Sequence, residues 1–177
     1  MSKRGEIVFV LGGARSGKSS FALNEAEGIG SKRAYVATAR ITDNEMAERV
    51  RRHQAERAHR WETFEEPLKI KELFGNLKGR FDVIVLDCIT LWISNMMLDG
   101  LEEEAILEET RGLCSVLAEI ASESSVYIVS NEVGLGIVPD NPLARQFRDV
   151  AGRVNQLIAQ VADRVYFIVS GLSMKLK

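Results

Sequence analysis

The chain of 177 residues has little cysteine, no excess of charge of either sign and no long apolar run. Cys88 and Cys114 stand far apart without metal-binding spacing, which argues against a disulfide framework and indicates buried, reduced thiols. Lys plus Arg total 23 against 25 Asp plus Glu, so no overall charge recruits nucleic acid or an anionic membrane. Apolar runs such as residues 83–86 are too short to cross a bilayer. We expect a cytoplasmic protein without a membrane span or a nucleic-acid partner.

No internal repeat or Pro/Gly-rich linker divides the chain, so we expect residues 1–177 to form a single domain. Short segments rich in Val, Ile, Phe or Tyr alternate with helical stretches. The predicted strands are residues 6–11, 33–38, 82–87, 126–130 and 165–169, and the predicted helices are residues 17–28, 43–58, 68–76, 101–122 and 142–161. This alternation predicts an α/β fold with a mostly parallel central sheet, helices on both faces, and ligands at the carboxyl ends of the strands.

The strongest motif follows the first predicted strand directly. It matches the phosphate-binding pattern G-x-x-x-x-G-K-[ST] in full, with Gly12, Gly13, Ala14, Arg15, Ser16, Gly17, Lys18 and Ser19. Such glycines let backbone N–H groups meet phosphate oxygens at the start of a helix. Lys18 would neutralise the outer phosphates and Ser19 would ligate Mg²⁺. The alternative is a chance glycine turn before a helix, but the preceding strand favours a nucleoside triphosphate site.

A second apolar strand ends in a carboxylate, Asp87. This is the expected companion of a phosphate loop, because a strand-end aspartate holds magnesium in such enzymes. The alternative is an aspartate that caps the strand at a turn. The Asn-Lys-x-Asp motif of regulatory GTPases is absent, so these residues do not choose between ATP and GTP.

A basic helix carries the most informative histidine. Thr42 and Glu45 form a capping box that predicts its start. Along it Arg49, His53 and Arg57 are spaced four apart and share one face. Two flanking arginines favour the neutral imidazole, which is the form that attacks phosphorus, and they stabilise phosphate charge as it develops. The alternative is a solvated basic face with an incidental histidine.

The order of these motifs along the chain resembles one family closely, the bifunctional adenosylcobinamide kinase/adenosylcobinamide-phosphate guanylyltransferases of cobalamin biosynthesis. The resemblance covers nearly the whole chain. The stretches that carry it are residues 12–19, 37–39, 43–53, 61–65, 86–92, 130–139 and 143–156. It implies a RecA-like P-loop NTPase fold and a homotrimer whose sites lie between subunits.

The resemblance also implies two reactions. A nucleoside triphosphate, ATP or GTP, phosphorylates adenosylcobinamide. GTP then guanylylates an enzyme histidine, and the guanylyl group passes to adenosylcobinamide phosphate to give adenosylcobinamide-GDP. Carried over by motif, the guanylylated nucleophile is His53. The nucleotide site then comprises the phosphate loop with Ala37, Thr38, Ala39, Gln54, Ala55, Glu56, Arg57, Glu65 and Asp87.

The C-terminal half offers further candidates for the acceptor. In the glycine-rich residues 130–139, Asn131 and Glu132 would position substrate or a metal-bound water, or else Gly134 and Gly136 form a structural turn with positive φ. On the next helix the candidates for phosphate or propionamide contacts are Arg145, Arg148 and Arg153. The alternative for Arg148 is an ion pair with Asp149, either within the chain or between subunits. Residues 92–97 either face a corrinoid or form a core helix.

Two other functions stay open from the residues alone. One is a simple P-loop kinase or ATPase in which His53 is inert. The other is a nucleotide-gated binding protein in which no group is transferred. The absent GTPase motif and the histidine on an arginine face count against a switch.

Overall fold

The computed structural model describes residues 4–40 and 60–177. The predicted helix over residues 43–58 lies outside this part of the chain. The strands are β1 (Ile7–Gly12), β2 (Arg33–Ala37), β3 (Glu62–Glu65), β4 (Val83–Asp87), β5 (Ser125–Asn131), β6 (Arg164–Val169) and β7 (Leu172–Lys175). The helices are α1 (Lys18–Glu27), α3 (Ile70–Leu77), α4 (Ile89–Leu98), α5 (Glu103–Ile120) and α6 (Pro142–Val161).

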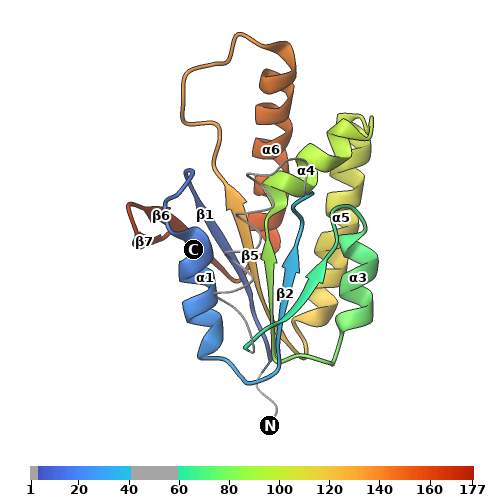
Figure 1. Cartoon of the computed structure of the whole chain (residues 1–177), viewed down its shortest axis with the longest axis vertical. Coiled ribbons are helices and arrows are strands. Elements are labelled where there is room, and N and C mark those ends of the chain that lie inside the picture. The colour runs from blue at the N-terminus through green and yellow to red at the C-terminus, as the bar shows by residue number, and fades with distance from the viewer. Residues whose placement is uncertain (1–3, 41–59) are drawn as a thin grey trace.

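The strands form one sheet in the order β3-β2-β4-β5-β1-β6-β7. Every neighbouring pair is parallel except β6 and β7, which are antiparallel. The predicted α/β fold with a mostly parallel sheet is therefore confirmed. In Figure 1 the arrows of β2 and β5 point toward the end of the molecule where the long β5–α6 loop projects. This end is the carboxyl edge, where such sheets bind ligands.

The two strands that the sequence did not predict, β3 and β7, are the outermost strands of the sheet. Each has four residues, and most of their side chains are exposed. Because both strands are short and largely exposed, neither contains the continuous run of apolar residues by which the other strands were predicted. Pairing with β2 and β6 defines them instead. The predicted bounds of the other strands, and those of α1, α3, α5 and α6, differ from the observed ones by at most two residues, whereas α4 was not among the predicted helices.

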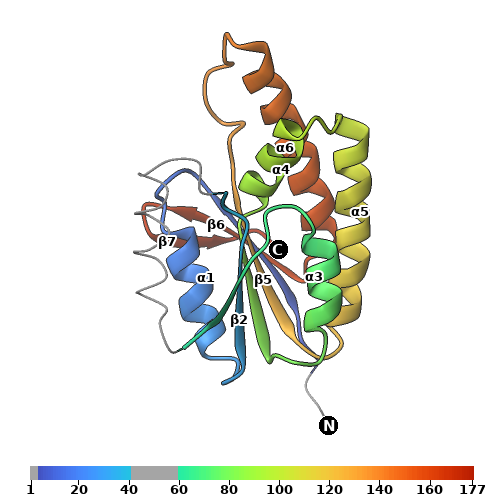
Figure 2. The same ribbon diagram turned by 45° about the vertical axis from the view of Figure 1, so that its right-hand side comes forward.

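Helices cover both faces of the sheet (Figure 2). Alternate residues of β1 face opposite ways, as the period of a strand requires. Val8 and Val10 pack with the α1 residues Ala22 and Ala26, while Phe9 joins the larger core under α3, α4, α5 and α6. No helix in the described part of the chain has the length and apolarity that crossing a bilayer requires.

The burial of helix α4 distinguishes between the two interpretations of residues 92–97, a surface that faces a corrinoid and a core helix. Trp92 is fully buried, and its indole Nε1 donates a hydrogen bond of 2.8 Å to the carbonyl oxygen of Leu68. Met96 is also buried in the core. The stretch is therefore a core helix and not a surface that faces a corrinoid.

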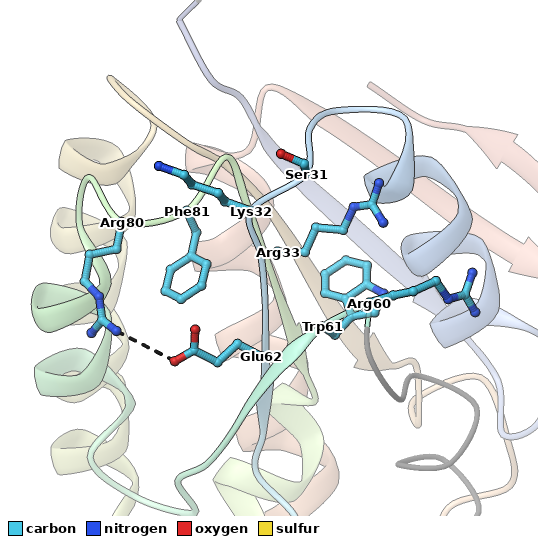
Figure 3. A pocket seen from close by; sticks show the side chains of 8 residues that line it. All are labelled: Ser31, Lys32, Arg33, Arg60, Trp61, Glu62, Arg80 and Phe81. Atoms are coloured by element: carbon cyan, nitrogen blue, oxygen red, sulfur yellow. Dashed lines mark ion pairs between the residues drawn. The ribbon is translucent and has the colours of Figure 1, made fainter.

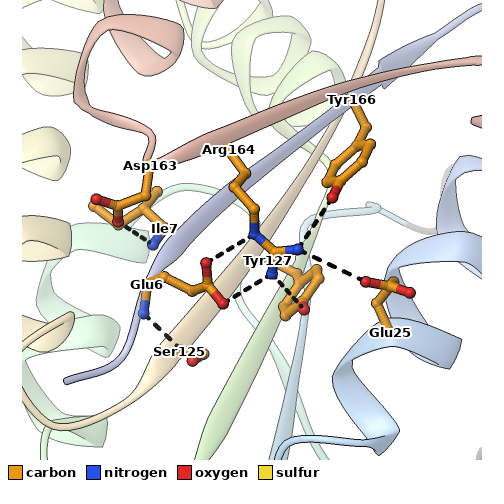
Figure 4. A network of polar contacts seen from close by, with 8 residues as sticks. All are labelled: Glu6, Ile7, Glu25, Ser125, Tyr127, Asp163, Arg164 and Tyr166. Carbon is orange, nitrogen blue, oxygen red and sulfur yellow. Dashed lines mark hydrogen bonds and ion pairs between the residues drawn. The ribbon is translucent and has the colours of Figure 1, made fainter. Parts of the chain in front are cut away.

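A polar network ties the amino ends of β1, β5 and β6 to α1 (Figure 4). Arg164 donates to both carboxylate oxygens of Glu6, at 2.7 and 2.8 Å, and to the hydroxyls of Tyr166 and Tyr127. Glu25 of α1 lies 3.9 Å away. Burial by itself lowers the pKa of Arg164. The hydrogen bonds to Glu6 and Tyr166 raise it by more than burial lowers it, so the net shift of the pKa is upward and the guanidinium stays charged.

Candidate active site at the carboxyl edge

The phosphate loop joins β1 to α1 and leaves the start of α1 open. Gly17, the residue before the helix, has φ 99°, and no side chain caps the first turn. The first N–H groups of a helix need partners from outside it, and an anion supplies them together with a favourable interaction with the helix dipole. The geometry is therefore that of a phosphate site.

The β6–β7 hairpin supports this loop. The N–H of Gly171 in the hairpin turn donates 2.8 Å to the carbonyl oxygen of Ser16. A Cβ atom at Gly12 would lie 2.5 Å from the carbonyl oxygen of Ile168, so only glycine lets the loop pass this close to β6. This support could not be predicted from the sequence, because β7 is exposed along its whole length and was not predicted as a strand.

Lys18 is the first residue of α1 and is 7% exposed. Its Nζ lies 2.5 Å from the carbonyl oxygen of Gly13 and 3.5 Å from Oγ of Ser16. The positive charge therefore lies at the loop backbone, where it would meet the outer phosphates of a nucleotide. Ser19 follows in the same turn and is half-buried.

The strand ends bring three predicted site residues into one row. Ala37 of β2 pairs with Asp87 of β4 on one side and with Glu65 of β3 on the other. Since β5 separates β4 from β1, Asp87 lies two strand spacings, about 10 Å, from β1. Glu65 lies four spacings, about 19 Å, from β1. Asp87 is thus near the phosphate loop, and Glu65 is at the far end of the same edge.

The Asp87 carboxylate is held from inside the protein. The hydroxyl of Tyr35, a buried residue of β2, donates 2.9 Å to Oδ2 of Asp87. Fully buried Thr38 donates 2.7 Å to the carbonyl oxygen of Cys88 and accepts 2.8 Å from the Cys88 N–H. The Thr38 side chain thus supports the segment after Asp87, and half-buried Ala39 follows it.

Both cysteines are free and buried, as the sequence predicted. Burial, and then the charge of Asp87, raise the pKa of the Cys88 thiol to about 12. Burial raises the pKa of Cys114 to about 11. Neither thiol is therefore ionised at neutral pH, and Cys88 is not a nucleophile despite its position beside the site.

Several predicted site residues lie in residues 41–59, outside the described part of the chain. They are His53, Gln54, Ala55, Glu56 and Arg57, together with the capping box of Thr42 and Glu45. The described residues on either side are each anchored by an ion pair. Arg40 bonds both oxygens of Asp99 at the end of α4 at 2.7 Å, and Arg60 lies 2.9 Å from Glu27 of α1.

The loop after β5 differs from the predicted alternative, because neither Gly134 nor Gly136 has positive φ. The turn is instead held by Glu132, whose side chain accepts 2.8 Å from the N–H of Gly134. The Glu132 N–H donates 3.0 Å to the carbonyl oxygen of Gly12. This bond connects the β5–α6 loop directly to the phosphate loop.

Below this loop lies a buried polar chain that sequence reasoning missed. The N–H of Asn131 donates 2.7 Å to Oγ1 of Thr90, which lies 3.2 Å from Oγ of Ser130. Ser130 in turn donates 2.8 Å to Oδ1 of Asn155 on α6. These four polar residues belong to three different elements, so no motif in the sequence reveals that they interact. In the folded protein they connect the end of β5 to α4 and α6.

Two hollows lie at opposite edges of the sheet. One of about 340 Å³ lies at the carboxyl edge and is lined by Gly134, Arg148, Asp149, Gly152, Arg153 and Gln156. The predicted ion pair between Arg148 and Asp149 is not among the ion pairs of residues 4–40 and 60–177. Arg153 pairs instead with Glu103 of α5.

The larger hollow, of about 500 Å³, lies at the amino edge (Figure 3). Of the four cations that line it, the three arginines have partners within the protein. Arg80 lies 3.7 Å from Glu62 and over the Phe81 ring, Arg33 donates to the carbonyl oxygens of Gly30 and Glu27, and Arg60 lies 2.9 Å from Glu27. Its position and these pairings make it a poor candidate for the active site.

The chain is similar to known proteins over nearly its whole length. A family model described as "Cobinamide kinase / cobinamide phosphate guanyltransferase" matches residues 8–176. The "Bifunctional adenosylcobalamin biosynthesis protein CobU" of Escherichia coli is 38% identical, with 97% of this chain and 99% of that protein covered. The corresponding CobP protein of Pseudomonas aeruginosa is 41% identical, with 95% of each chain covered.

Among solved structures, the RadB recombinase has a similar fold. The TM-score is 0.55 and the sequence identity is 20%, with 93% of this chain and 74% of that chain covered. At this identity the likeness concerns the fold alone. It agrees with the RecA-like P-loop architecture that the sequence predicted.

Proposed function

Since the chain belongs to the cobinamide kinase / cobinamide phosphate guanyltransferase family, we propose that it carries out both reactions at its carboxyl edge. It phosphorylates adenosylcobinamide, and it transfers GMP from GTP to adenosylcobinamide phosphate to give adenosylcobinamide-GDP. The protein acts as a single P-loop domain over residues 1–177, in the cytoplasm. The observation that carries the proposal is the uncapped start of α1 with Lys18 beside the loop, near Asp87.

The nucleotide binds with its outer phosphates on the loop. The N–H groups from Gly13 to Ser19 surround them, and Lys18 neutralises their charge. Ala37, Thr38, Ala39 and Glu65 lie along the edge toward β3, and the remainder of the nucleotide extends that way. Gln54, Ala55, Glu56 and Arg57 complete the nucleotide site, as the family resemblance implies. GTP is the guanylyl donor, and ATP or GTP is the phosphoryl donor.

Ser19 and Asp87 provide the kind of oxygen ligands that a magnesium ion requires. No group of three or more His, Cys, Asp or Glu side chains in the described part of the chain is arranged to hold a metal. Mg²⁺ does not need one, because it takes one or two protein oxygens and completes its shell with water and phosphate. The Ser19 hydroxyl and the Asp87 carboxylate supply those oxygens. The ion would neutralise charge on the phosphates during transfer.

The guanylyl transfer proceeds in two displacements. A ring nitrogen of His53 forms a bond to the α-phosphorus of GTP, and the bond from that phosphorus to pyrophosphate breaks. An oxygen of adenosylcobinamide phosphate then forms a bond to the same phosphorus, and the phosphorus–nitrogen bond breaks with its electron pair returning to the imidazole. Splitting one transfer into two lowers the barrier of each step.

Exposed apolar side chains support a homotrimer. The β5–α6 loop projects from the end of the molecule (Figure 1). Leu135 and Ile137 of this loop are 78% and 98% exposed, and Leu143 at the start of α6 is 58% exposed. A cluster of large apolar side chains in water is typical of a contact surface. We propose that a neighbouring copy covers it, with three copies as the family resemblance implies.

Labelled GTP tests the chemistry. Incubation with Mg²⁺ and GTP labelled on the α-phosphate should give an acid-labile adduct on His53, and His53→Ala should give none. His59→Ala is the matched control and should label normally. An unlabelled wild-type protein, or equal labelling of His53→Ala, would overturn the guanylyltransferase mechanism. A simple kinase would transfer the γ-phosphate without any protein-bound nucleotide.

A further inference from the structure

The hollow at the carboxyl edge is placed to hold the acceptor. It is lined by Gly134 of the loop after β5 and by residues on one side of α6. Through Glu132 and Gly12 the loop is bonded directly to the phosphate loop. Asn155 donates 3.3 Å to the carbonyl oxygen of Asn131, which holds α6 against the end of β5. A molecule in this hollow would therefore lie next to a nucleotide on the phosphate loop.

The charges around the hollow cancel. Arg148 and Asp149 both line it, and Arg153 is already paired with Glu103. Adjacent helix positions do not face each other, so Arg148 and Asp149 present opposite charges to the hollow without joining in an ion pair. A site with two guanidiniums and two carboxylates has little net attraction for a phosphate group.

Such a site instead suits a group that both donates and accepts hydrogen bonds. A primary carboxamide does both, since its oxygen accepts from a guanidinium and its N–H₂ donates to a carboxylate. Gln156 adds a further donor and acceptor. The hollow also has room, because a Cβ atom at Gly152 would meet nothing within 4 Å.

We infer that this hollow binds peripheral carboxamide groups of the corrin ring of the acceptor, with Arg148 donating to an amide oxygen and Asp149 accepting from an amide N–H₂. The inference rests on the proposed function and names where its large substrate is held. A volume of about 340 Å³ takes part of the rim of the ring and not the whole ring. Because the amides are the same before and after phosphorylation, one site serves the acceptor in both reactions.

Corrinoid binding without nucleotide tests this inference. The dissociation constants of adenosylcobinamide and of adenosylcobinamide phosphate are measured by equilibrium dialysis, with the absorbance of the corrin ring as the signal. We expect Arg148→Met and Asp149→Leu each to weaken binding of both corrinoids about tenfold, because each removes a charge-assisted hydrogen bond. Arg111→Met, on the exposed side of α5, is the matched control and should bind both normally.

The outcomes separate the alternatives. Unchanged dissociation constants for both corrinoids would overturn the inference, and a loss confined to the phosphorylated corrinoid would make the hollow a phosphate site instead. If Arg148→Met does not fold, Asp149→Asn and Gln156→Met carry the same test, since both positions are exposed. Failure of the proposed function is seen separately, as wild-type protein that gains no guanylyl label from GTP.

Discussion

The two edges of the sheet use charge in opposite ways. At the amino edge the charged groups are partners of one another, as in the bidentate pair of Arg164 with Glu6 and the pair of Arg60 with Glu27. At the carboxyl edge the start of α1 has no side-chain cap, and Arg148 faces a hollow. The larger hollow belongs to the first edge, whereas we propose that the chemistry takes place at the second. The comparison teaches that polar groups without an internal partner, and not the size of a hollow, point to the proposed active site.

The largest expected effect is a difference in kinase activity between two variants, each of which lacks one lysine at one edge of the sheet. Lys18→Met removes the charge beside the phosphate loop and should lower kcat/KM of the kinase reaction at least about 100-fold, because that charge stabilises the transferred phosphoryl group. Lys32→Met, at the amino-edge hollow, should change it less than about twofold. Steady-state kinetics with thermal unfolding of both variants checks this. Comparable activity of the two variants would break the contrast between the edges.

Arg164→Met should affect stability and not chemistry. The variant leaves Glu6 without its bidentate partner and Tyr127 without a donor in a half-buried network. We expect the free energy of unfolding to fall by about 2 kcal/mol, measured in urea. Arg80→Met, an exposed residue at the same edge, should cost less than about 0.5 kcal/mol. Equal losses would mean that the Arg164 network contributes no more than a surface pair.

Tyr35→Phe tests whether the orientation of Asp87 at the carboxyl edge matters for Mg²⁺ binding. It removes only the hydroxyl that orients Asp87. The Mg²⁺ concentration that gives half-maximal nucleotide binding, measured by calorimetry, should rise about tenfold, since partners that orient a ligand tune metal affinity. Tyr166→Phe in the Arg164 network is the control and should leave this value unchanged. A normal Mg²⁺ dependence in Tyr35→Phe would show that Asp87 is not a magnesium ligand or needs no orientation.

The last prediction concerns Cys88, whose effect on stability is absent at neutral pH and appears only in alkali. Its raised pKa, about 12, means that the folded protein keeps a proton that the unfolded chain loses near pH 9. The free energy of unfolding should therefore fall as pH rises from 9 to 12, by at most about 1.4 kcal/mol per pH unit from this thiol. The difference between wild type and Cys88→Ala, from urea titrations at several pH values, isolates it. A difference that does not vary with pH would show that the thiol titrates normally when folded.

Much of the fold could be predicted because its signals are local. The five predicted strands are short apolar runs, most of them buried, and residues 12–19 match a motif that is expected between a strand and a helix. The exposed strands β3 and β7 have no such signal. Of the two alternatives for residues 130–139, the turn with positive φ at Gly134 and Gly136 is wrong, because the side chain of Glu132 and not a glycine conformation holds that turn.

The sequence by itself determined the phosphate loop, the aspartate at the end of β4 and the family, because each depends on residue types at short spacings. Only the tertiary structure decided which groups meet. It showed that β5 lies between β1 and β4, that Tyr35 holds Asp87, and that Arg148 and Asp149 line a hollow without pairing. The physical reason is that strand order and helix docking are set by burial of apolar faces over the whole sheet, which no local spacing records.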